Sequence, residues 1–440
     1  MSSLTFISRP VSSGDSINGE LRVPGDKSIS HRSVMLGAIA EGVTEVSGFL
    51  QGDDNLATVN AFRAMGVNIE QGNDTELSIT GVGLHGLQAP QKTLYLGNSG
   101  TSIRLLCGLL AGQKFDSVLT GDASLLKRPM RRVTLPLAEM GADIATVEGG
   151  MPPLSISAVS SLNAIDYLMP VASAQVKSCL ILAALYAEGV SRITEPAPTR
   201  DHTERMLAGF GCSVGRDGDT VVVNPEGVRL SACKVDVPAD ISSAAFFLVA
   251  ASIVPGSDLL LKHVGINPTR IGVINILMQM GANIEIISER EIGGEPVADI
   301  RVRYAQLNGI HIPEDQVPLA IDEFPVLFIA AACAEGETIL TGAEELRVKE
   351  SDRIQSMVDG LLAIGVKAVA QDDGIIIQGG GDISGGEVDS HGDHRIAMAF
   401  TMAGLVSAGA ITIRDCSNVN TSFPDFIGLA RQVGVNVESA

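Results

Sequence analysis

Hydrophobic and polar positions follow one pattern that recurs six times along the chain. Each copy opens with small polar residues, continues with about ten apolar residues and turns at a glycine. A strand-like stretch and a second amphipathic run follow, and the copy closes at another glycine. The turn glycines are Gly42, Gly112, Gly189, Gly256, Gly336 and Gly409. The closing glycines, 69–84 residues apart, are Gly66, Gly141, Gly211, Gly281, Gly365 and Gly434.

The length of this period indicates what each copy contains. Common solenoid repeats are roughly 20–50 residues long, so a period of about 70 residues is too long for them. It fits a supersecondary unit of two helices and several strands. Six such units predict a closed, pseudo-symmetric assembly rather than an open rod.

The first copy shows the order of elements. Asp26 or Ser28, after a Pro-Gly turn, is expected to cap a helix that runs to about Ala40. Gly42 suits the left-handed backbone that often follows a helix. Residues 43–46 alternate between apolar and polar positions and predict a strand.

A second helix and strand complete the copy. Residues 53–55 are expected to cap a helix from Leu56 to Met65, and residues 66–70 turn into another alternating strand. The same order returns after Asn98, Ser173, Asp240, Asp322 and Gly392.

This order predicts an α/β protein of six βαβαββ repeats, three in each of two similar lobes. Crossings near residues 22–25 and 234–240 divide the chain into a discontinuous lobe, 1–24 plus 238–440, and a second lobe, 25–237. The first strand, residues 4–7, precedes copy one, so the chain is expected to begin in the lobe where it ends. Helix N-termini attract anions, and an active site is expected in the cleft between the lobes.

Composition and charge narrow the class of protein. The chain has 440 residues, of which 45% are hydrophobic and 19% charged, as is typical of a well-folded protein of more than one domain. It has no Trp, which argues against aromatic platforms for single-stranded nucleic acid. A net charge of −20 disfavours nucleic acid and anionic membranes as partners, but a local cluster of cations could still bind a small anion.

The cysteines and the apolar stretches predict the compartment. The six cysteines are scattered without a C-x-x-C motif, which favours reduced core thiols over a metal site or disulfides. The longest mostly apolar stretch, residues 244–254, is shorter than the roughly 20 residues that span a bilayer. The first ten residues lack a basic and apolar leader, so a soluble cytoplasmic protein is expected.

Charged residues that could take part in binding or catalysis gather at the start of the repeats. Arginine binds phosphate and carboxylate groups through two parallel hydrogen bonds, and lysine supplies a mobile charge. The basic residues there are Lys27, Arg32, Arg104, Lys127, Arg128, Arg131, Arg132, Lys177, Arg200, Arg347, Lys349, Arg353 and Arg395. Carboxylates occur in the same places, at Asp322, Glu323, Glu350 and Asp393.

Each of these residues also has an ordinary structural interpretation. A single charge is commonly a solvated surface group, Asp240 and Asp322 could be plain helix caps, and Glu350 could be a surface helix residue. His31 and His394 lack the spacing of metal ligands. The turn at residues 98–101 lacks the Walker pattern, so nucleoside triphosphate binding is not supported. The recurrence of cations at equivalent helix starts favours an anion site.

Nine short motifs make the chain resemble the enolpyruvyl transferases, and specifically the 5-enolpyruvylshikimate-3-phosphate (EPSP) synthase family. These motifs span nearly the whole chain: PGDKSISHR (24–32), LGNSGTSIRLL (96–106), KRPM (127–130), SAQVKS (173–178), TRDHTE (199–204), IDEFP (321–325), RVKESDRI (347–354), GDHRIAMAF (392–400) and TSFPDF (421–426).

The resemblance implies a fold, a reaction and two substrates. The family fold is a two-lobed inverse α/β barrel of six βαβαββ units, three per lobe. The implied reaction transfers the enolpyruvyl group of phosphoenolpyruvate to the 5-hydroxyl of shikimate 3-phosphate by addition and elimination, and phosphate leaves. It belongs to the shikimate pathway, which leads to chorismate and the aromatic amino acids. No metal, nucleotide or redox cofactor is implied.

The resemblance also carries roles onto particular residues. Asp322 and Glu350 match the proton-transfer residues, and Lys27 matches a residue that stabilises charge or assists proton transfer. The residues that match the shikimate 3-phosphate site are Lys27, Ser28, Arg32, Ser173, Ala174, Gln175, Arg200, Asp322 and Lys349. The residues that match the phosphoenolpyruvate site are Lys27, Asn98, Gly100, Arg128, Gln175, Arg353 and Arg395.

Three positions vary within the family. Ala174 stands where some relatives have a second serine, and Thr421 stands where many have a lysine, so another cation is expected to serve the phosphoenolpyruvate side. Gly100 stands where some naturally glyphosate-tolerant relatives have alanine, whose methyl group crowds the inhibitor. We therefore expect this protein to be a glyphosate target.

Two other functions are the alternatives. UDP-N-acetylglucosamine enolpyruvyl transferases share the fold and the donor, but they typically have Lys-Asn at the position of Lys27-Ser28 and a loop cysteine at the position of Ala123. A non-catalytic anion-binding scaffold would need cations but not the carboxylates Asp322 and Glu350. Both comparisons favour the synthase. A monomer is expected, because six repeats can complete two cores within one chain.

Overall fold

The computed structural model describes residues 4–440, which form two compact units. Unit 1 comprises residues up to Pro24, Pro238–Arg290 and Pro296–Ala440, and unit 2 comprises Gly25–Val237 and Glu291–Glu295. The chain therefore passes between units after residues 24 and 237. The short segment Glu291–Glu295, which the sequence boundaries assign to the discontinuous lobe, belongs to unit 2.

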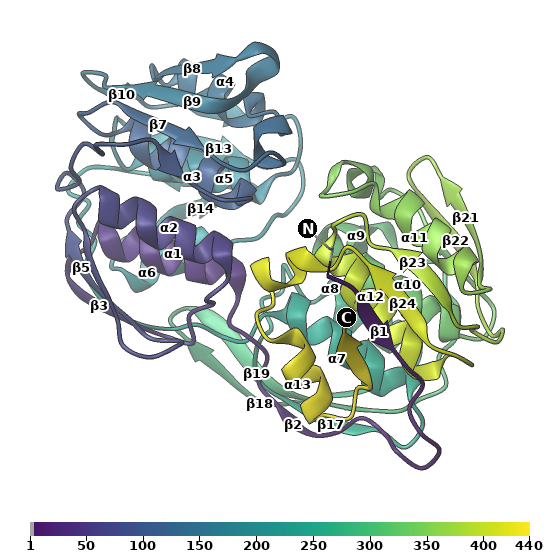
Figure 1. The fold of residues 1–440 in the computed structure, drawn as a ribbon. Coiled ribbons are helices and arrows are strands. Elements are labelled where there is room, and N and C mark those ends of the chain that lie inside the picture. The colour runs from purple at the N-terminus through teal and green to yellow at the C-terminus, as the bar shows by residue number, and fades with distance from the viewer. Residues whose placement is uncertain (1–3) are drawn as a thin grey trace. The chain divides into compact units, whose positions relative to one another are not determined.

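Unit 2 contains three helix pairs and the strands that follow them (Figure 1). Its helices are α1 (Lys27–Ala38), α2 (Asp53–Ala64), α3 (Gly100–Ala111), α4 (Arg131–Glu139), α5 (Ala174–Ala184) and α6 (His202–Gly209). Its strands are β3 (Glu41–Ser47), β4 (Asn68–Gln71), β5 (Leu77–Val82), β6 (Leu94–Tyr95), β7 (Ser117–Thr120), β8 (Asp143–Val147), β9 (Met151–Ser157), β10 (Leu162–Asn163), β11 (Asp166–Leu168), β12 (Ala187–Glu188), β13 (Ser191–Thr194), β14 (Gly215–Asp217), β15 (Thr220–Val223) and β16 (Lys234–Asp236).

Unit 1 repeats the arrangement with three further helix pairs and one short extra helix, α9. Its helices are α7 (Ile241–Ile253), α8 (Gly272–Gln279), α9 (Val317–Ala320), α10 (Phe324–Cys333), α11 (Arg353–Ala363), α12 (His394–Ala403) and α13 (Phe426–Gln432). Its strands are β1 (Phe6–Ser8), β2 (Asn18–Leu21), β17 (Asp258–Gly265), β18 (Asn283–Ile292), β19 (Glu295–Arg303), β20 (Glu337–Leu340), β21 (Lys367–Gln371), β22 (Gly374–Gln378), β23 (Gly386–Asp389), β24 (Ile411–Arg414) and β25 (Val437–Ser439).

Each repeat builds a sheet with the same order of strands. In the second repeat β6 pairs parallel with β7, β7 pairs antiparallel with β9, and β9 pairs antiparallel with β8. The corresponding sheets have the orders β16-β3-β5-β4, β11-β13-β15-β14, β2-β17-β19-β18 and β23-β24-β1-β25. In the fifth repeat an isolated parallel bridge, His311↔Ile339, takes the place of the first strand beside β20-β22-β21. The predicted α/β architecture of six βαβαββ repeats is confirmed.

Strands from the ends of the units complete the sheets. The N-terminal strand β1 lies between β24 and β25 and pairs antiparallel with both, so the chain begins in the unit where it ends. Strand β2 pairs parallel with β17, and β16 pairs parallel with β3. Each unit therefore closes through pairings between segments far apart in the sequence.

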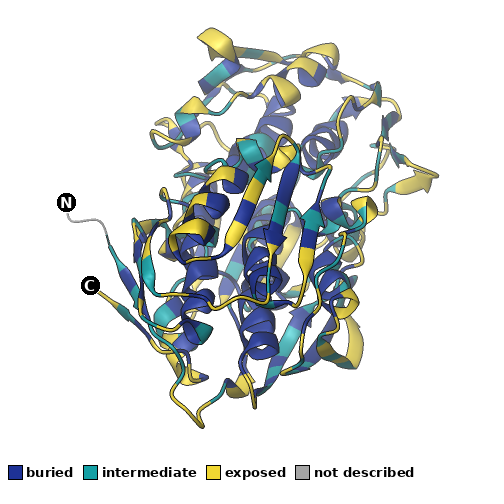
Figure 2. Ribbon diagram, turned by 90° about the vertical axis from the view of Figure 1, so that its right-hand side faces the viewer, coloured by how far each residue is buried: buried dark blue, intermediate teal, exposed yellow. Residues whose placement is uncertain are grey.

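The first helix of each repeat is buried inside its unit. All thirteen residues of α7 are buried, and the helix packs against α10 and α12. Figure 2 shows dark blue helices inside the protein, whereas strands at the surface change along their length between dark blue, teal and yellow. Close packing requires small residues: a Cβ atom at Gly108 of α3 would lie 2.0 Å from the carbonyl oxygen of Cys179 in α5. Each unit has its own hydrophobic core.

Most of the predicted helix starts are correct to within a residue. Asp26 caps α1 and accepts a hydrogen bond from the Ile29 N–H, and Ser173 and Asp240 cap α5 and α7. The predicted cap of α2 is wrong, because Gly52 precedes the helix and Asp53 and Asp54 lie in its first turn. There their charges still interact favourably with the helix dipole.

Candidate active site

The N-terminal turns of α1 and α3 and the first half of α2 meet at a buried polar cluster in unit 2. The imidazole Nδ1 of His31 lies 2.9 Å from the Thr58 hydroxyl and 3.2 Å from the Ser102 hydroxyl. The two hydroxyl groups lie 2.7 Å apart. These contacts fix three helix starts relative to one another, and His31 itself is fully buried.

Burial of His31 predicts a pH dependence of stability. Burial, followed by the nearby charge of Lys27, lowers the pKa of His31 from 6.5 to about 3. The unfolded chain therefore binds a proton near pH 6.5 that the folded protein excludes. Stability should be full above pH 6.5 and fall by up to about 1.4 kcal/mol per pH unit as the pH decreases toward 3.

Urea denaturation at pH 7.0 and pH 5.5 tests this dependence. In the variant His31→Asn, the free energy of unfolding should depend less on pH, by the contribution of about one proton. The variant His391→Asn, which changes an exposed histidine, should keep the pH dependence of the wild type. An unchanged slope in His31→Asn would contradict the assignment.

Arg32 is the most enclosed cation of the residues predicted to bind shikimate 3-phosphate. Its Nε donates to the Thr203 hydroxyl at 2.7 Å, and Nη2 donates to the Ser178 hydroxyl at 2.9 Å. Burial lowers the pKa of Arg32 to about 10. Among residues 4–440 its hydrogen bonds go to neutral oxygen atoms, including the carbonyl of Ser28 at 3.0 Å. Carboxylates, with Glu204 the strongest, act on this charge only at longer range.

Gln175 and Arg128 connect α3 to its neighbours. Arg104 donates to the Gln175 side-chain oxygen at 2.7 Å, and the Gln175 amide donates to Thr101 at 3.0 Å. Nη2 of Arg128 donates to the Asn98 side-chain oxygen at 2.7 Å. Burial, with the charges of Arg128 and Arg132, lowers the pKa of Arg104 to about 10. These contacts bring Asn98, Gln175 and Arg128 together around the start of α3.

Lys27 is paired with a residue that sequence reasoning assigned only to a helix cap. Its Nζ lies 2.6 Å from Oδ2 of Asp54, and the lysine side chain keeps 27% of its surface exposed. Ser173 accepts a hydrogen bond from the Val176 N–H at the start of α5, and Ala174 is the first residue of that helix. Arg200 is partly exposed in the segment before α6.

Lys177 does not face the same region as the other cations. Its side chain is fully buried, and its Nζ lies 3.0 Å from Glu195 and 2.7 Å from Glu204. The sequence pattern groups it with the other basic residues at the helix starts. The structure instead makes it the centre of an internal ion-pair cluster.

In unit 1, Asp322 lies between two of the predicted cations. Its Oδ1 is 3.6 Å from Nζ of Lys349 and 3.5 Å from Nη1 of Arg353. The side chains of Asp322 and Lys349 each keep 18% of their surface exposed, so they are reachable from solvent.

Arg353 joins the predicted residues of this unit into one cluster. It lies 2.5 Å from Glu350 and 2.8 Å from Asp393, and only 1% of its side chain is exposed. Burial acts to lower the pKa of Arg353, but the surrounding carboxylates, above all Asp393, raise it above its usual value. Asp393, which also caps α12, fixes the guanidinium and was not among the predicted site residues.

Arg395 completes the cluster at the start of α12. Its Nη1 donates to the main-chain oxygen of Asp322 at 2.8 Å and lies 3.7 Å from the buried Glu323. The structure thus brings together Asp322, Lys349, Glu350, Arg353 and Arg395, all of which the sequence pattern selected. Each unit contains a set of cations with fixed hydrogen-bonding partners at helix N-termini, as anion binding requires.

Comparisons with known proteins identify the family. The EPSP synthase (3-phosphoshikimate 1-carboxyvinyltransferase) profile matches residues 11–429. The chain belongs to the EPSP synthase family. A 3-phosphoshikimate 1-carboxyvinyltransferase of Methylococcus capsulatus is 67% identical over 97% of each chain, and one of Alkalilimnicola ehrlichii is 64% identical over 96% of this chain and 94% of its own. An EPSP synthase structure from Acinetobacter baumannii is 57% identical with a TM-score of 0.91 over the whole of both chains.

Membership of the EPSP synthase family makes the protein an enzyme, a transferase. The helix starts described above carry the motifs by which the sequence resembles the family, and the solved relatives share the fold. No helix in the described part of the chain is long and apolar enough to cross a bilayer. Residues 4–440 contain no group of three or more His, Cys, Asp or Glu side chains that could hold a metal ion.

Thr421 stands at the position where many members of the EPSP synthase family have a lysine. Its hydroxyl donates to the main-chain oxygen of Asn418 at 2.7 Å, and the Asn418 amide donates to the Gly392 oxygen at 2.7 Å. Thr421 thus closes a 3-10 turn, Ser417–Thr421, that packs against α12. The residue stabilises the turn and supplies no charge.

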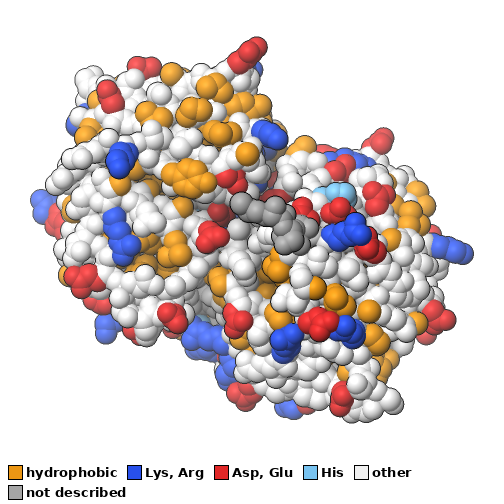
Figure 3. All heavy atoms as spheres, in the orientation of Figure 1, with side chains coloured by type: hydrophobic (Ala, Val, Ile, Leu, Met, Phe, Trp, Pro, Cys, Tyr) orange, Lys and Arg blue, Asp and Glu red, His pale blue; other side chains and the backbone are white. Residues whose placement is uncertain are grey.

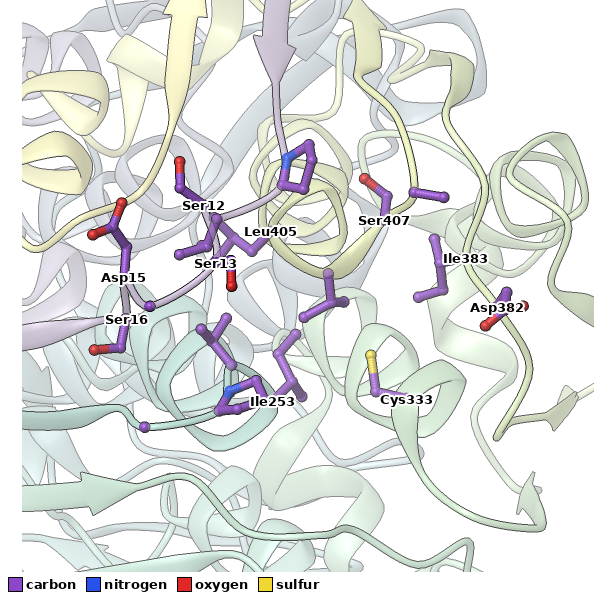
Figure 4. Close-up of a pocket in the computed structure, with 18 of the residues that line it drawn as sticks. Ser12, Ser13, Asp15, Ser16, Ile253, Cys333, Asp382, Ile383, Leu405 and Ser407 are labelled. Carbon is purple, nitrogen blue, oxygen red and sulfur yellow. The ribbon is translucent and has the colours of Figure 1, made fainter.

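A pocket of about 980 Å³ lies at the opposite end of the unit 1 helices (Figure 4). It is lined by residues 10–16, by the C-terminal ends of α7 and α10, and by residues 405–408 after α12. Its charged lining residues are Asp15 and Asp382, with no Lys, Arg or His. The partial negative charge of helix C-termini adds to these carboxylates. This pocket is therefore unsuited to the two anionic substrates of the EPSP synthase family.

Proposed function

We propose that this protein transfers the enolpyruvyl group of phosphoenolpyruvate to the 5-hydroxyl of shikimate 3-phosphate, with Asp322, Glu350 and Lys27 as its catalytic residues. The observation that carries the proposal is the cluster in unit 1, where Asp322 lies 3.6 Å from Lys349 and 3.5 Å from Arg353, which in turn binds Glu350. An anion-binding scaffold has no use for carboxylates among its cations. Acid–base chemistry on an anionic substrate needs cations that bind the substrate and carboxylates that transfer protons.

The reaction assigns a proton to each carboxylate. The 5-hydroxyl oxygen attacks C2 of phosphoenolpyruvate and loses its proton to Asp322, while the methylene carbon C3 gains a proton from Glu350. The tetrahedral intermediate then expels phosphate and returns the C3 proton, which restores the double bond in the product. Lys27 stabilises the charge that develops as the C–O bond to phosphate breaks.

Each substrate is assigned a set of residues. We assign Lys27, Asn98, Gly100, Arg128, Gln175, Arg353 and Arg395 to phosphoenolpyruvate. We assign Lys27, Ser28, Arg32, Ser173, Ala174, Gln175, Arg200, Asp322 and Lys349 to shikimate 3-phosphate. Arg32 supports this assignment, because among residues 4–440 the hydrogen bonds of its buried guanidinium go to neutral oxygen atoms, and a guanidinium binds phosphate strongly.

Phosphate release tests the acceptor directly. The purified protein is incubated with phosphoenolpyruvate and either shikimate 3-phosphate or UDP-N-acetylglucosamine. Release with shikimate 3-phosphate alone is the expected result. Release only with UDP-N-acetylglucosamine would refute the acceptor assignment, and no release from folded protein with either acceptor would refute the catalytic function.

Gly100 predicts sensitivity to glyphosate. A Cβ atom at this position would lie 2.9 Å from Nη1 of Arg104 and 3.2 Å from Nη1 of Arg128. The wild-type protein should be inhibited by glyphosate in competition with phosphoenolpyruvate. Gly100→Ala should raise the inhibition constant at least about tenfold, and the KM for phosphoenolpyruvate by a smaller factor, because misplaced arginines bind less well.

Steady-state kinetics of both proteins at several phosphoenolpyruvate concentrations measure this effect. Gly381→Ala is the control, because it adds a methyl group at an exposed position with nothing within 4 Å and without a left-handed backbone. Non-competitive inhibition of the wild type, or equal sensitivity of Gly100→Ala, would contradict the prediction.

We further infer that the protein acts as a monomer in the cytoplasm. In support, strands of the same chain complete the sheets of each unit, and the six cysteines form no disulfide. On the face drawn in Figure 3, Lys and Arg side chains stand among Asp and Glu side chains. Light scattering should give a mass near 45.8 kDa, and twice that mass would refute the monomer.

A further inference from the structure

Arg270 lies outside the sequence motifs, yet its side chain is almost completely buried beside the unit 1 cluster. It ends a tight turn between β17 and α8. In this turn Asn267 Oδ1 accepts hydrogen bonds from the Thr269 N–H at 2.9 Å and the Thr269 hydroxyl at 2.7 Å, and the Arg270 N–H donates to the Asn267 carbonyl at 2.8 Å. These bonds fix the backbone from which the guanidinium extends.

The guanidinium of Arg270 joins the N-terminal ends of α7 and α10. Its Nη2 donates to the Ser242 hydroxyl at 2.7 Å and to Oδ1 of Asp240 at 3.2 Å. It also lies 3.8 Å from Oε1 of Glu323. The Ser242 hydroxyl donates a short hydrogen bond to the same Glu323 oxygen. Arg270 thus supports Glu323 both directly and through Ser242.

Glu323 is a fully buried carboxylate between two arginines. Its Oε1 lies 3.8 Å from Nη2 of Arg270 and 3.7 Å from Nη1 of Arg395, and its side chain has no exposed surface. A buried charge is costly unless it is paired, so the two arginines and the carboxylate depend on one another. Arg395 in turn donates to the main-chain oxygen of Asp322, the residue before Glu323.

We propose that Glu323 and Arg270 are positioning residues for the transfer reaction, which set the guanidinium of Arg395 and the backbone of Asp322. They touch neither substrate in this proposal and act through Arg395 and Asp322. The inference rests on the proposed function, in which Arg395 binds phosphoenolpyruvate. Asp322 itself keeps its side-chain contacts with Lys349 and Arg353.

The variant Glu323→Gln tests this role with little change in shape. The amide oxygen can still accept the hydrogen bond from Ser242, but the charge that holds Arg395 is removed. The KM for phosphoenolpyruvate should rise about tenfold to a hundredfold, and kcat should fall, because small displacements of binding groups have effects of this size. The KM for shikimate 3-phosphate should change less than about twofold.

Variants of Arg270 separate positioning from folding. Arg270→Lys, which keeps the charge, should retain more activity than Arg270→Met, and both should affect phosphoenolpyruvate more than shikimate 3-phosphate. Arg303→Met is the matched control: it removes an arginine of β19 that binds Asp258 and Glu285, and it should leave both KM values unchanged.

Circular dichroism and an unfolding midpoint are recorded for each variant. If Glu323→Gln does not fold, Ser242→Ala removes the short hydrogen bond while leaving all charges in place, and it should raise the KM for phosphoenolpyruvate severalfold. Folded Glu323→Gln or Ser242→Ala with unchanged KM for phosphoenolpyruvate, or with equal changes for both substrates, would overturn the proposal. An inactive wild type would instead refute the proposed function, which the phosphate-release assay detects first.

Discussion

Replacing Asp322 by alanine is expected to lower kcat by about 10²–10⁴-fold, the range typical for loss of a general base. The carboxylate is proposed to take the proton of the attacking 5-hydroxyl, and it lies 3.6 Å from Lys349 and 3.5 Å from Arg353. Without it the hydroxyl remains a poor nucleophile. This is the largest functional effect that we predict.

Substrate affinity should change much less than turnover. Arg353 keeps its contacts with Asp393 at 2.8 Å and Glu350 at 2.5 Å after the substitution, so the cluster is not left without anions. Calorimetric titration of Asp322→Ala with shikimate 3-phosphate should give a dissociation constant within about tenfold of the wild-type value, which corresponds to less than about 1.4 kcal/mol.

Asp315→Ala provides the matched control, because this exposed aspartate lies seven residues away in the same segment and contacts only Gln316 among the described residues. It should retain full activity. A kcat of Asp322→Ala within tenfold of the wild type would show that another group takes the proton. Loss of folding, seen by circular dichroism, would instead give Asp322 a structural role.

Replacing Lys177 by methionine is expected to lower the free energy of unfolding of unit 2 by about 3–5 kcal/mol. Lys177 and Glu195 have no exposed side-chain surface, and Glu204 has 12%. Methionine has a similar length but cannot neutralise either carboxylate. Two negative charges would then remain buried, offset by Arg216, which is 3.4 Å from Glu195 and 45% exposed, and by the longer-range charge of Arg32 on Glu204.

Tyrosine fluorescence during urea denaturation measures this loss in the correct unit. The chain has no Trp, and three of its four tyrosines, Tyr95, Tyr167 and Tyr186, belong to unit 2. The control Lys92→Met changes an exposed lysine of the same unit and should have almost no effect. The double variant K177M/E195Q should recover part of the loss, because it removes one unpaired charge. If the free energy of unfolding fell by less than about 1 kcal/mol, water or a rearrangement of side chains would be compensating the two carboxylates, and the prediction would be wrong.

The two predictions concern lysines and carboxylates that look alike in the sequence. Lys177 and Lys349 both lie near helix starts beside motif residues, but Lys177 is enclosed by Glu195 and Glu204 whereas Lys349 is partly exposed beside Asp322. Sequence position alone could not separate them. The difference arises because α5 turns Lys177 toward Glu195, which follows β13, and toward Glu204 in α6, and only packing decides which face of a helix is covered.

Features that depend on neighbouring residues were predictable from the sequence. The six repeats, the glycine turns and the helix starts at Asp26, Ser173 and Asp240 follow from local periodicity and from capping, which involve residues three or four positions apart. The motifs selected Asp322, Lys349, Glu350, Arg353 and Arg395, which the structure places in one cluster.

Contacts between distant segments were decided only by the tertiary structure. Asp393 binds Arg353 across 40 residues, Asp54 binds Lys27 across 27, and Arg270 reaches Ser242 across 28. No local pattern marks such partners, because a carboxylate at a helix start satisfies the capping preference whether or not a cation reaches it. The sequence by itself determined the repeat and the residues available for chemistry. The packing of helix starts around each unit's core determined which of those residues meet, because burial is what forces each charge to find a partner.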